Sequence, residues 1–162
     1  MTICGKHSNV KLLKESTGRV AQVTQIAREQ PEMSLMCCCS PNLGLIVPTM
    51  TLGGHGTANM TGNIIPREMA MISKPWEKFK DVENFQAAYL HSLPMLHYAY
   101  SAINPVPMKS LLAVLGLPTG PMRKPQRHLH GATLQRGLDI VQEFRLMKAY
   151  GLSPINTLAA AE

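Results

Sequence analysis

The sequence has no apolar run long enough to cross a bilayer. Its longest such run, Leu43–Met50, is interrupted by Gly44 and Pro48, whereas a transmembrane helix needs about 20 consecutive apolar residues. The first seven residues also lack the basic start and apolar stretch of a secretory signal, and they lack the arginine-rich pattern of a transit peptide. These absences predict a cytoplasmic protein that has no membrane partner.

Cysteine is scarce, and its arrangement is unsuited to a metal. Three of the four cysteines are consecutive, Cys37, Cys38 and Cys39, whereas a structural zinc site needs thiolates in pairs about two to four residues apart. Neighbouring residues of a strand point to opposite faces, so the three thiols do not converge on one ion. We therefore expect a core strand of reduced cysteines rather than a metal or redox site, and no cofactor.

Aromatic residues make up only 5% of the chain, and the net charge of +6 comes from basic residues scattered along it. Lysine and arginine never stand more than two together, which is typical of a solvated surface rather than a nucleic-acid site. The one local basic cluster, Arg123–His128, has no interleaved aromatic side chain for stacking on bases. It is predicted to be a polar loop, and no nucleic-acid partner is expected.

The first part of the chain alternates between strand-like and helix-like segments. Each apolar stretch of strand length breaks into a polar or glycine-containing turn before the next segment begins. Three such units in series predict parallel strands joined by right-handed helical crossovers. The predicted strands are Asn9–Leu13, which delivers Lys14 to a turn, Met33–Cys39 and Thr57–Thr61, and the predicted helices are Val20–Glu29 and Leu43–Leu52, with a break near Pro48.

No strand pattern recurs after Arg67, and the remainder divides into helical segments separated by proline-rich and glycine-rich stretches. The last segment has apolar residues at helical spacing and is closed by Gly151. We therefore expect βα units over residues 1–66, a helical extension over 67–154 and a tail over 155–162. The predicted helices of the extension are Arg67–Ile72, Val82–Tyr98, Met108–Leu115 and Leu134–Tyr150.

Four motifs occur in the order and spacing of one enzyme family. Leu12-Leu13-Lys14-Glu15-Ser16-Thr17-Gly18 resembles the segment of dihydrodipicolinate synthases and N-acetylneuraminate lyases in which a barrel strand ends on the Schiff-base lysine. The other three are Leu52–Gly56, similar to the glycine-rich approach to the eighth strand, Gly62–Pro66, similar to the exit from that strand, and Asn104–Lys109, similar to an element of the C-terminal helices. The resemblance covers residues 8–152.

The resemblance implies an α/β fold, a partial TIM (β/α)8 barrel made of about the last three βα units and followed by a C-terminal helical extension. Family members are complete eight-stranded barrels, so the first five βα units are expected to lie outside this chain. Those units carry the loop that holds the keto acid's carboxylate and the tyrosine that relays protons. We therefore expect a truncated chain that is inactive alone and forms a homo-oligomer or needs the missing barrel half.

The resemblance implies that Lys14 stands at the position of the imine-forming lysine. A lysine attacks a carbonyl only as the neutral amine, so burial or a nearby cation must lower its pKa from about 10.4. TIM-barrel active sites lie at the carboxyl ends of the strands, where the apolar pair Leu12-Leu13 would anchor Lys14. Without the resemblance, Lys14 reads as an ordinary solvated turn lysine. Lys11 is the alternative candidate, but a residue three positions earlier in a strand lies on the opposite face. Lys11 is also not followed by the Glu-Ser-Thr-Gly turn.

The resemblance implies a pyruvate-dependent lyase or synthase that works through a lysine–pyruvate imine, with pyruvate or a related 2-keto acid as substrate. Ala58 matches the eighth-strand residue whose backbone approaches the keto acid, where isoleucine or valine is usual. Pro41 stands where the family usually has glycine, and a proline removes an N–H group. Glu15, Thr17 and Asn63 are predicted to fix turns.

The alternative function of the chain is that of a non-catalytic remnant or interaction module derived from the same family.

Overall fold

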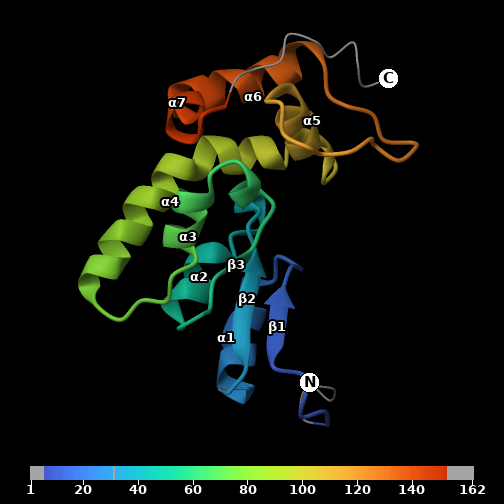
Figure 1. Ribbon diagram of the computed structural model, residues 1–162. Helices are drawn as coiled ribbons and strands as arrows, with labels where there is room; N and C mark the ends of the chain where they lie inside the picture. The colour runs from blue at the N-terminus through green and yellow to red at the C-terminus, as the bar shows by residue number, and fades with distance from the viewer. Residues whose placement is uncertain (1–5, 31, 153–162) are drawn as a thin grey trace. The chain divides into compact units, whose positions relative to one another are not determined.

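The computed structural model describes residues 6–30 and 32–152, so the predicted tail lies outside the described residues. Within them the chain is an α/β protein with one three-stranded parallel sheet and helices (Figure 1). In chain order the elements are β1 (Leu12–Glu15), α1 (Val20–Glu29), β2 (Ser34–Cys38), η1 (Pro41–Leu43), α2 (Ile46–Thr51), β3 (Thr57–Ala58), η2 (Thr61–Asn63), α3 (Pro66–Ile72), α4 (Phe79–Ala99), α5 (Val106–Val114), α6 (Gly131–Glu143) and α7 (Leu146–Tyr150).

The three strands are parallel and lie in the order β1-β2-β3, which confirms the predicted succession of βα units. Lys14 pairs with Met36, and Cys38 pairs with Ala58. Paired residues of adjacent strands project from the same face, and alternate residues of one strand share a face. Lys14, Met36, Cys38 and Ala58 therefore lie on one face of the sheet, which we call the open face.

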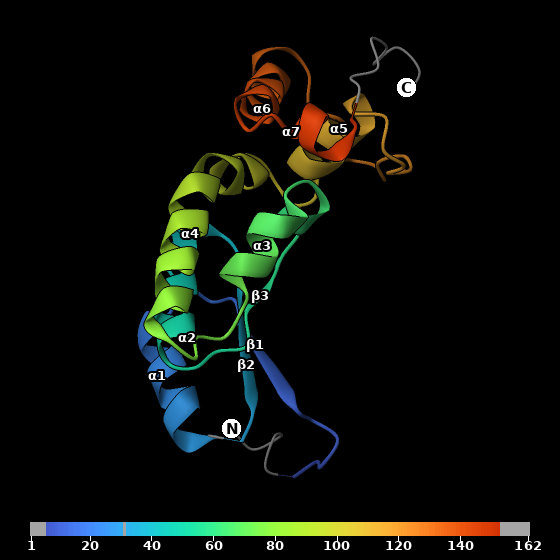
Figure 2. The same cartoon turned by 60° about the vertical axis from the view of Figure 1, so that its left-hand side comes forward.

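The opposite face of the sheet is covered by helices. Leu35, Cys37 and Cys39 on this face are 5% exposed or less, and Val23 and Ile26 of α1 are also buried. Figure 2 shows α1 and α2 on the same side of the strands. The alternation of buried and half-exposed residues along β2 therefore marks a sheet with helices on one side among the described residues.

The described residues divide into two compact units by their contacts. The first comprises the residues up to Asn59 together with Arg67–His91, and it holds the sheet. The second comprises Met60–Pro66 and the residues from Ser92 onward, and it is helical, with buried residues such as Leu96, Leu111 and Val141 in its interior. The predicted domain division at residue 66 stays a prediction.

Several elements differ from the sequence-based expectation. The third strand is only two residues long, because it pairs with just Cys37 and Cys38 of β2. Pro48 does not break α2, since it lies in the first turn, where backbone N–H groups have no partner within the helix. The last predicted helix is two helices, because Arg145 adopts a left-handed conformation with φ 52° between α6 and α7.

Other predicted boundaries are close to those observed. The helix predicted to close at Gly151 does so, with Gly151 at φ 66° after the last residue of α7.

Among the described residues, none of the helices combines the length and the apolar character that a membrane span requires.

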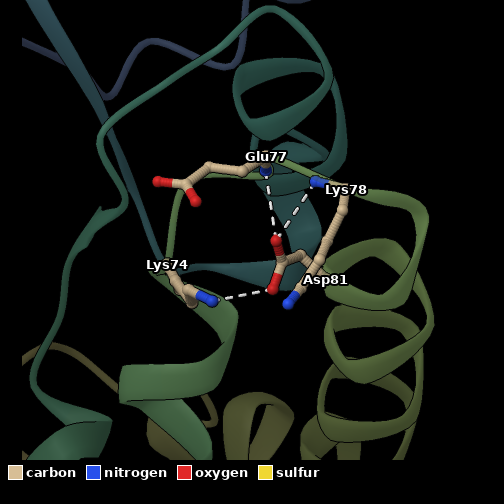
Figure 3. A network of polar contacts seen from close by, with 4 residues as sticks. All are labelled: Lys74, Glu77, Lys78 and Asp81. Atoms are coloured by element: carbon tan, nitrogen blue, oxygen red, sulfur yellow. Dashed lines mark hydrogen bonds and ion pairs between the residues drawn. The ribbon is translucent and has the colours of Figure 1, made fainter.

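A buried carboxylate fixes the loop between α3 and α4. Asp81, which is 5% exposed, accepts a 2.7 Å hydrogen bond from the Lys74 ammonium through Oδ1. Its Oδ2 accepts hydrogen bonds from the backbone N–H groups of Glu77 at 3.1 Å and Lys78 at 3.3 Å (Figure 3). One side chain therefore satisfies two loop amides and one cation beside the sheet.

This network predicts acid sensitivity. The Lys74 side chain, followed by the Glu77 amide, holds the pKa of Asp81 below its usual value. A carboxyl with a lowered pKa contributes stability above its unfolded pKa of about 3.9, and the contribution is lost as the pH falls through the folded pKa. We expect Asp81→Asn to lower the melting temperature by roughly 3–10 °C at pH 7, and the difference from the parent to shrink as the pH falls below about 3.9 toward the folded pKa.

The matched control is Glu83→Gln, which removes an exposed ion pair with Lys80 whose two side chains are 48% and 66% exposed. Exposed pairs contribute little to stability, so this variant should melt close to the parent at both pH values. Thermal melts of the three proteins at pH 7 and pH 3 check the prediction. An Asp81→Asn deficit that is the same at both pH values would contradict it.

Candidate active site

Lys14 lies at the carboxyl end of β1, one residue before the strand ends. Its side chain is exposed on the open face, opposite Met36 of the neighbouring strand. The predicted strand stopped at Leu13, whereas the observed strand continues through Lys14 and Glu15 because these residues pair with Met36 and Cys37. The extra pairing gives Lys14 a defined face, which a turn residue would not have.

Ala58 lies at the carboxyl end of β3 and is half-buried. It pairs with Cys38, which is two residues beyond Met36 on the same face of β2. Because all three strands are parallel, their carboxyl ends lie at the same edge of the sheet. The fold thus brings Lys14 and Ala58, the two predicted site residues, to one face and one edge, with β2 between them.

The turn after Lys14 is held by Glu15. Glu15 is 3% exposed and points to the helix-covered face, opposite to Lys14. Its carboxylate accepts hydrogen bonds from the Thr17 backbone N–H at 2.5 Å and the Thr17 hydroxyl at 2.6 Å. The backbone N–H of Arg19, immediately before α1, donates to the same hydroxyl at 3.3 Å. Glu15 and Thr17 therefore fix the turn, as predicted, and orient the strand end that carries Lys14.

The third strand is held from the helix-covered side. Thr57 is 5% exposed, and its backbone N–H and hydroxyl contact the Ser73 hydroxyl at 3.3 and 2.9 Å. Gly56 precedes it with φ 108°, and a Cβ atom there would lie 2.8 Å from the Ser73 backbone oxygen. Only glycine permits this close approach at that φ. The glycine-rich motif thus sets the position of Ala58 through its neighbour.

Residues beside the predicted pair complete the description. Pro41 begins η1 just beyond β2, and its carbonyl accepts a hydrogen bond from the Gly44 N–H at 3.2 Å. Asn63 donates from Nδ2 to the Met60 carbonyl at 2.8 Å, which confirms it as a turn residue. His55 is exposed in its loop. Lys11 lies before β1 and is exposed.

The consecutive cysteines separate between the two faces of the sheet. Cys37 and Cys39 are fully buried on the helix-covered side, and burial raises the pKa of the Cys37 thiol to about 11. Cys38 is half-exposed on the open face beside Ala58. No cluster of three or more metal-ligating side chains occurs within residues 6–30 and 32–152. The thiol of Cys37 is therefore protonated and unreactive at neutral pH.

Sequence reasoning treated all three cysteines as core and did not connect Cys38 or Met36 with the site. Residues of a strand alternate between its two faces, so the pairing of Lys14 with Met36 puts every second residue of β2 on the face of Lys14. The sequence alone does not say which residue of β2 pairs with Lys14. The open face offers an amine from Lys14 and a thiol from Cys38, and no carboxylate or imidazole on the three described strands shares this face.

Comparisons with known proteins agree with this geometry. The sequence profile of the Dihydrodipicolinate synthetase family matches residues 4–143. A 4-hydroxy-tetrahydrodipicolinate synthase from Moorella thermoacetica is 33% identical over 125 residues, covering 77% of this chain and 41% of that protein. Another from Lachnoclostridium phytofermentans is 29% identical over 133 residues, covering 81% and 44%.

A solved structure has the same fold. The crystal structure of dihydrodipicolinate synthase from Aquifex aeolicus superposes with a TM-score of 0.79 at 19% identity, covering 96% of this chain and 50% of that one. The chain thus spans less than half the length of the two curated relatives and half of the solved chain. Structural relatives of this kind are TIM barrels, and the three parallel strands with their helices are consistent with part of such a barrel.

Proposed function

The chain belongs to the dihydrodipicolinate synthetase family, and we propose that it carries the imine-forming lysine, Lys14, of a pyruvate-dependent Schiff-base lyase or synthase. The observation that carries the proposal is the position of Lys14. It lies at the carboxyl end of a parallel strand, on the face of the sheet that no described helix of the sheet's own unit covers, and Ala58 shares that face. In a TIM barrel this face becomes the interior and this edge becomes the active-site end.

The chemistry begins with the neutral amine of Lys14. Its nitrogen attacks the ketone carbon of pyruvate, the carbonyl oxygen leaves as water, and a C=N bond replaces the C=O bond. Protonation of the imine nitrogen lets it accept electron density when the methyl carbon loses a proton. The resulting enamine adds to an aldehyde, or forms in reverse when a carbon–carbon bond is cleaved.

Ala58 is proposed to line the keto acid's position through its backbone. Its side chain is small and half-buried, and the strand that carries it is anchored on the far side by the hydrogen bonds of Thr57 to Ser73. A backbone contact does not require a particular side chain, so alanine can stand where larger residues are usual in the family. The Glu15–Thr17 turn positions Lys14 in the same indirect way.

Full activity requires that the open face be covered. Lys14 is exposed there, so water has free access to it, whereas a closed active site excludes water and holds the substrate against the reacting group. In the described sheet, β1 and β3 each pair on one side only, so both leave backbone groups available for further strands. We propose that five more βα units of the family's barrel cover this face, and that the working form is a homo-oligomer or a complex with such units.

Borohydride trapping tests the role of Lys14. The chain is mixed with a segment that supplies the other five βα units, and pyruvate and sodium borohydride are added. We expect one reduced pyruvate adduct per chain at Lys14, located by peptide mass spectrometry. Lys14→Arg keeps the positive charge but cannot form the imine. Because the nucleophilic amine is removed, this variant should lose at least about nine-tenths of the label.

Lys11→Arg is the matched control, because Lys11 is exposed on the same segment but lies before the strand. It should label as well as the parent. Labelling that survives Lys14→Arg would remove Lys14 from its role. A complemented sample that folds and associates but takes no label at any lysine would instead support the alternative, a non-catalytic remnant that serves as an interaction module.

A further inference from the structure

The helical unit is much more basic than the unit that holds the sheet. Among its described residues from Ser92 onward, seven basic residues stand against two acidic ones, a net charge of +5 for the described part of this unit. Scattered along the sequence, these charges look like an ordinary solvated surface. The basic residues are Lys109, Arg123, Lys124, Arg127, Arg136, Arg145 and Lys148, and the acidic ones are Asp139 and Glu143.

Three of these cations gather at one cavity. The cavity has a volume of about 590 Å³ and is lined by Ile103, Val106 and the continuous segment Arg123–Arg127. That segment contributes two guanidinium groups and one ammonium and contains no acidic residue. None of the ion pairs in the described part of the chain involves its three basic residues. Their charges are therefore not neutralised from within this part of the protein.

The loop that carries these cations is tied to α5 on both sides. Before the basic segment, the Lys109 ammonium donates to the Pro121 carbonyl at 2.9 Å. After it, the Leu129 backbone N–H donates to the Ser110 hydroxyl at 2.8 Å, and that buried hydroxyl donates to the Val106 carbonyl at 2.7 Å. A loop anchored at both ends loses less conformational entropy when a ligand binds, so the cations are partly preorganised.

We propose that this cavity binds a small organic phosphate, a phosphate monoester that carries a compact apolar or sugar body. Two arginines match the geometry of phosphate oxygens, and the three cations exceed the charge of one phosphate dianion. Ile103, Val106 and Pro125 provide an apolar wall for the rest of the molecule. The lining has no aromatic side chain on which bases could stack, which favours a small ligand over a nucleic-acid strand.

The site is distinct from the one that carries Lys14, and the inference does not depend on imine formation. All of its lining residues belong to the helical unit. The family's substrate is expected to be a monocarboxylate, pyruvate, which lacks both the charge and the body that this cavity matches. The structure therefore assigns the chain a second ligand class.

Calorimetric titration of the full chain tests the inference, with phenyl phosphate as the probe. The titration is repeated with inorganic phosphate, benzoate and a single-stranded oligonucleotide at one fixed salt concentration. We expect saturable binding of phenyl phosphate, with affinities for inorganic phosphate and benzoate lower by about tenfold or more. Arg123→Gln/Arg127→Gln should weaken phenyl phosphate binding at least about tenfold, the effect of losing a charged hydrogen bond.

The control is Arg136→Gln/Lys148→Gln, which removes the same charge from exposed helix positions of the same unit that do not line the cavity. It should bind phenyl phosphate within about twofold of the parent, since distant exposed charges are screened by salt. Circular dichroism and thermal melts confirm that each variant is folded. Absence of saturable binding, an equal loss in both variants, or tighter binding of the oligonucleotide than of phenyl phosphate would each overturn the inference.

Discussion

The 162-residue chain alone should show no measurable lyase or synthase turnover, and addition of the other five βα units should raise the rate by at least about 10⁵-fold. The resemblance implies that, in the family, those units supply the loop that holds the keto acid's carboxylate and the tyrosine that relays protons. Positioning accounts for roughly 7–11 kcal/mol of a barrier, and acid–base catalysis for about 10²–10⁴-fold in rate. The open face of the described strands offers neither group.

The measurement is steady-state turnover of pyruvate with an aldehyde partner, for the chain alone and after co-expression with the corresponding part of the Moorella thermoacetica relative. Lys14→Ala in the complemented sample should return the rate to that of the chain alone. Lys11→Ala should leave it unchanged. Turnover by the chain alone at the complemented rate would contradict the prediction, and it would mean that self-association supplies the missing groups.

Gly137→Ala should destabilise the helical unit by about 1–3 kcal/mol, the range of an overpacked core site. In an open helix the same change would stabilise by about 1 kcal/mol, because alanine is the better helix former. Here a Cβ atom would lie 2.4 Å from Cζ of Tyr98 and 2.6 Å from its hydroxyl oxygen. Tyr98 is fully buried, so its ring cannot move aside into solvent. The steric term therefore exceeds the propensity term.

Urea unfolding of a double-mutant cycle checks this effect. Tyr98→Leu removes the ring that meets the new methyl group, so the cost of Gly137→Ala should be at least about 1 kcal/mol smaller in that background. Tyr98→Phe serves as the control. Burial raises the pKa of Tyr98 to about 12, and its hydroxyl has no hydrogen-bond partner among the described residues. Removing that hydroxyl should be neutral or slightly stabilising. Equal costs of Gly137→Ala in both backgrounds would show that the ring is not responsible.

The segment around Lys14 contains features that the sequence predicted correctly and features that depend on other parts of the protein. The heptad that contains Lys14 predicted a lysine at the end of a strand, and the structure confirms that position. It also predicted that Glu15 and Thr17 fix the turn, which the hydrogen bonds confirm. The catalytic role of Lys14 and the substrate contact of Ala58 stay predictions, because they depend on groups that reach the open face from elsewhere.

The sequence by itself determined the features that depend on local pattern. Alternation of strand-like and helix-like segments, closed by turns and by Gly151, predicted three parallel strands and a helical remainder. Apolar periodicity is a property of neighbouring residues, so it is visible without tertiary contacts. The family resemblance depends on the order and spacing of motifs along the chain, so it is also visible without tertiary contacts. These are the parts of the fold that sequence reasoning predicted correctly.

Only the tertiary structure decided which residues meet. The pairing of β1 with β2 put Cys38 on the face of Lys14, and the left-handed Arg145 divided one predicted helix into two. The contact of Tyr98 with Gly137 and the cavity lined by Arg123–Arg127 likewise join segments far apart in sequence. Register, burial and cavities arise from packing between elements, whose energies depend on distance in space, and a single sequence does not specify that distance.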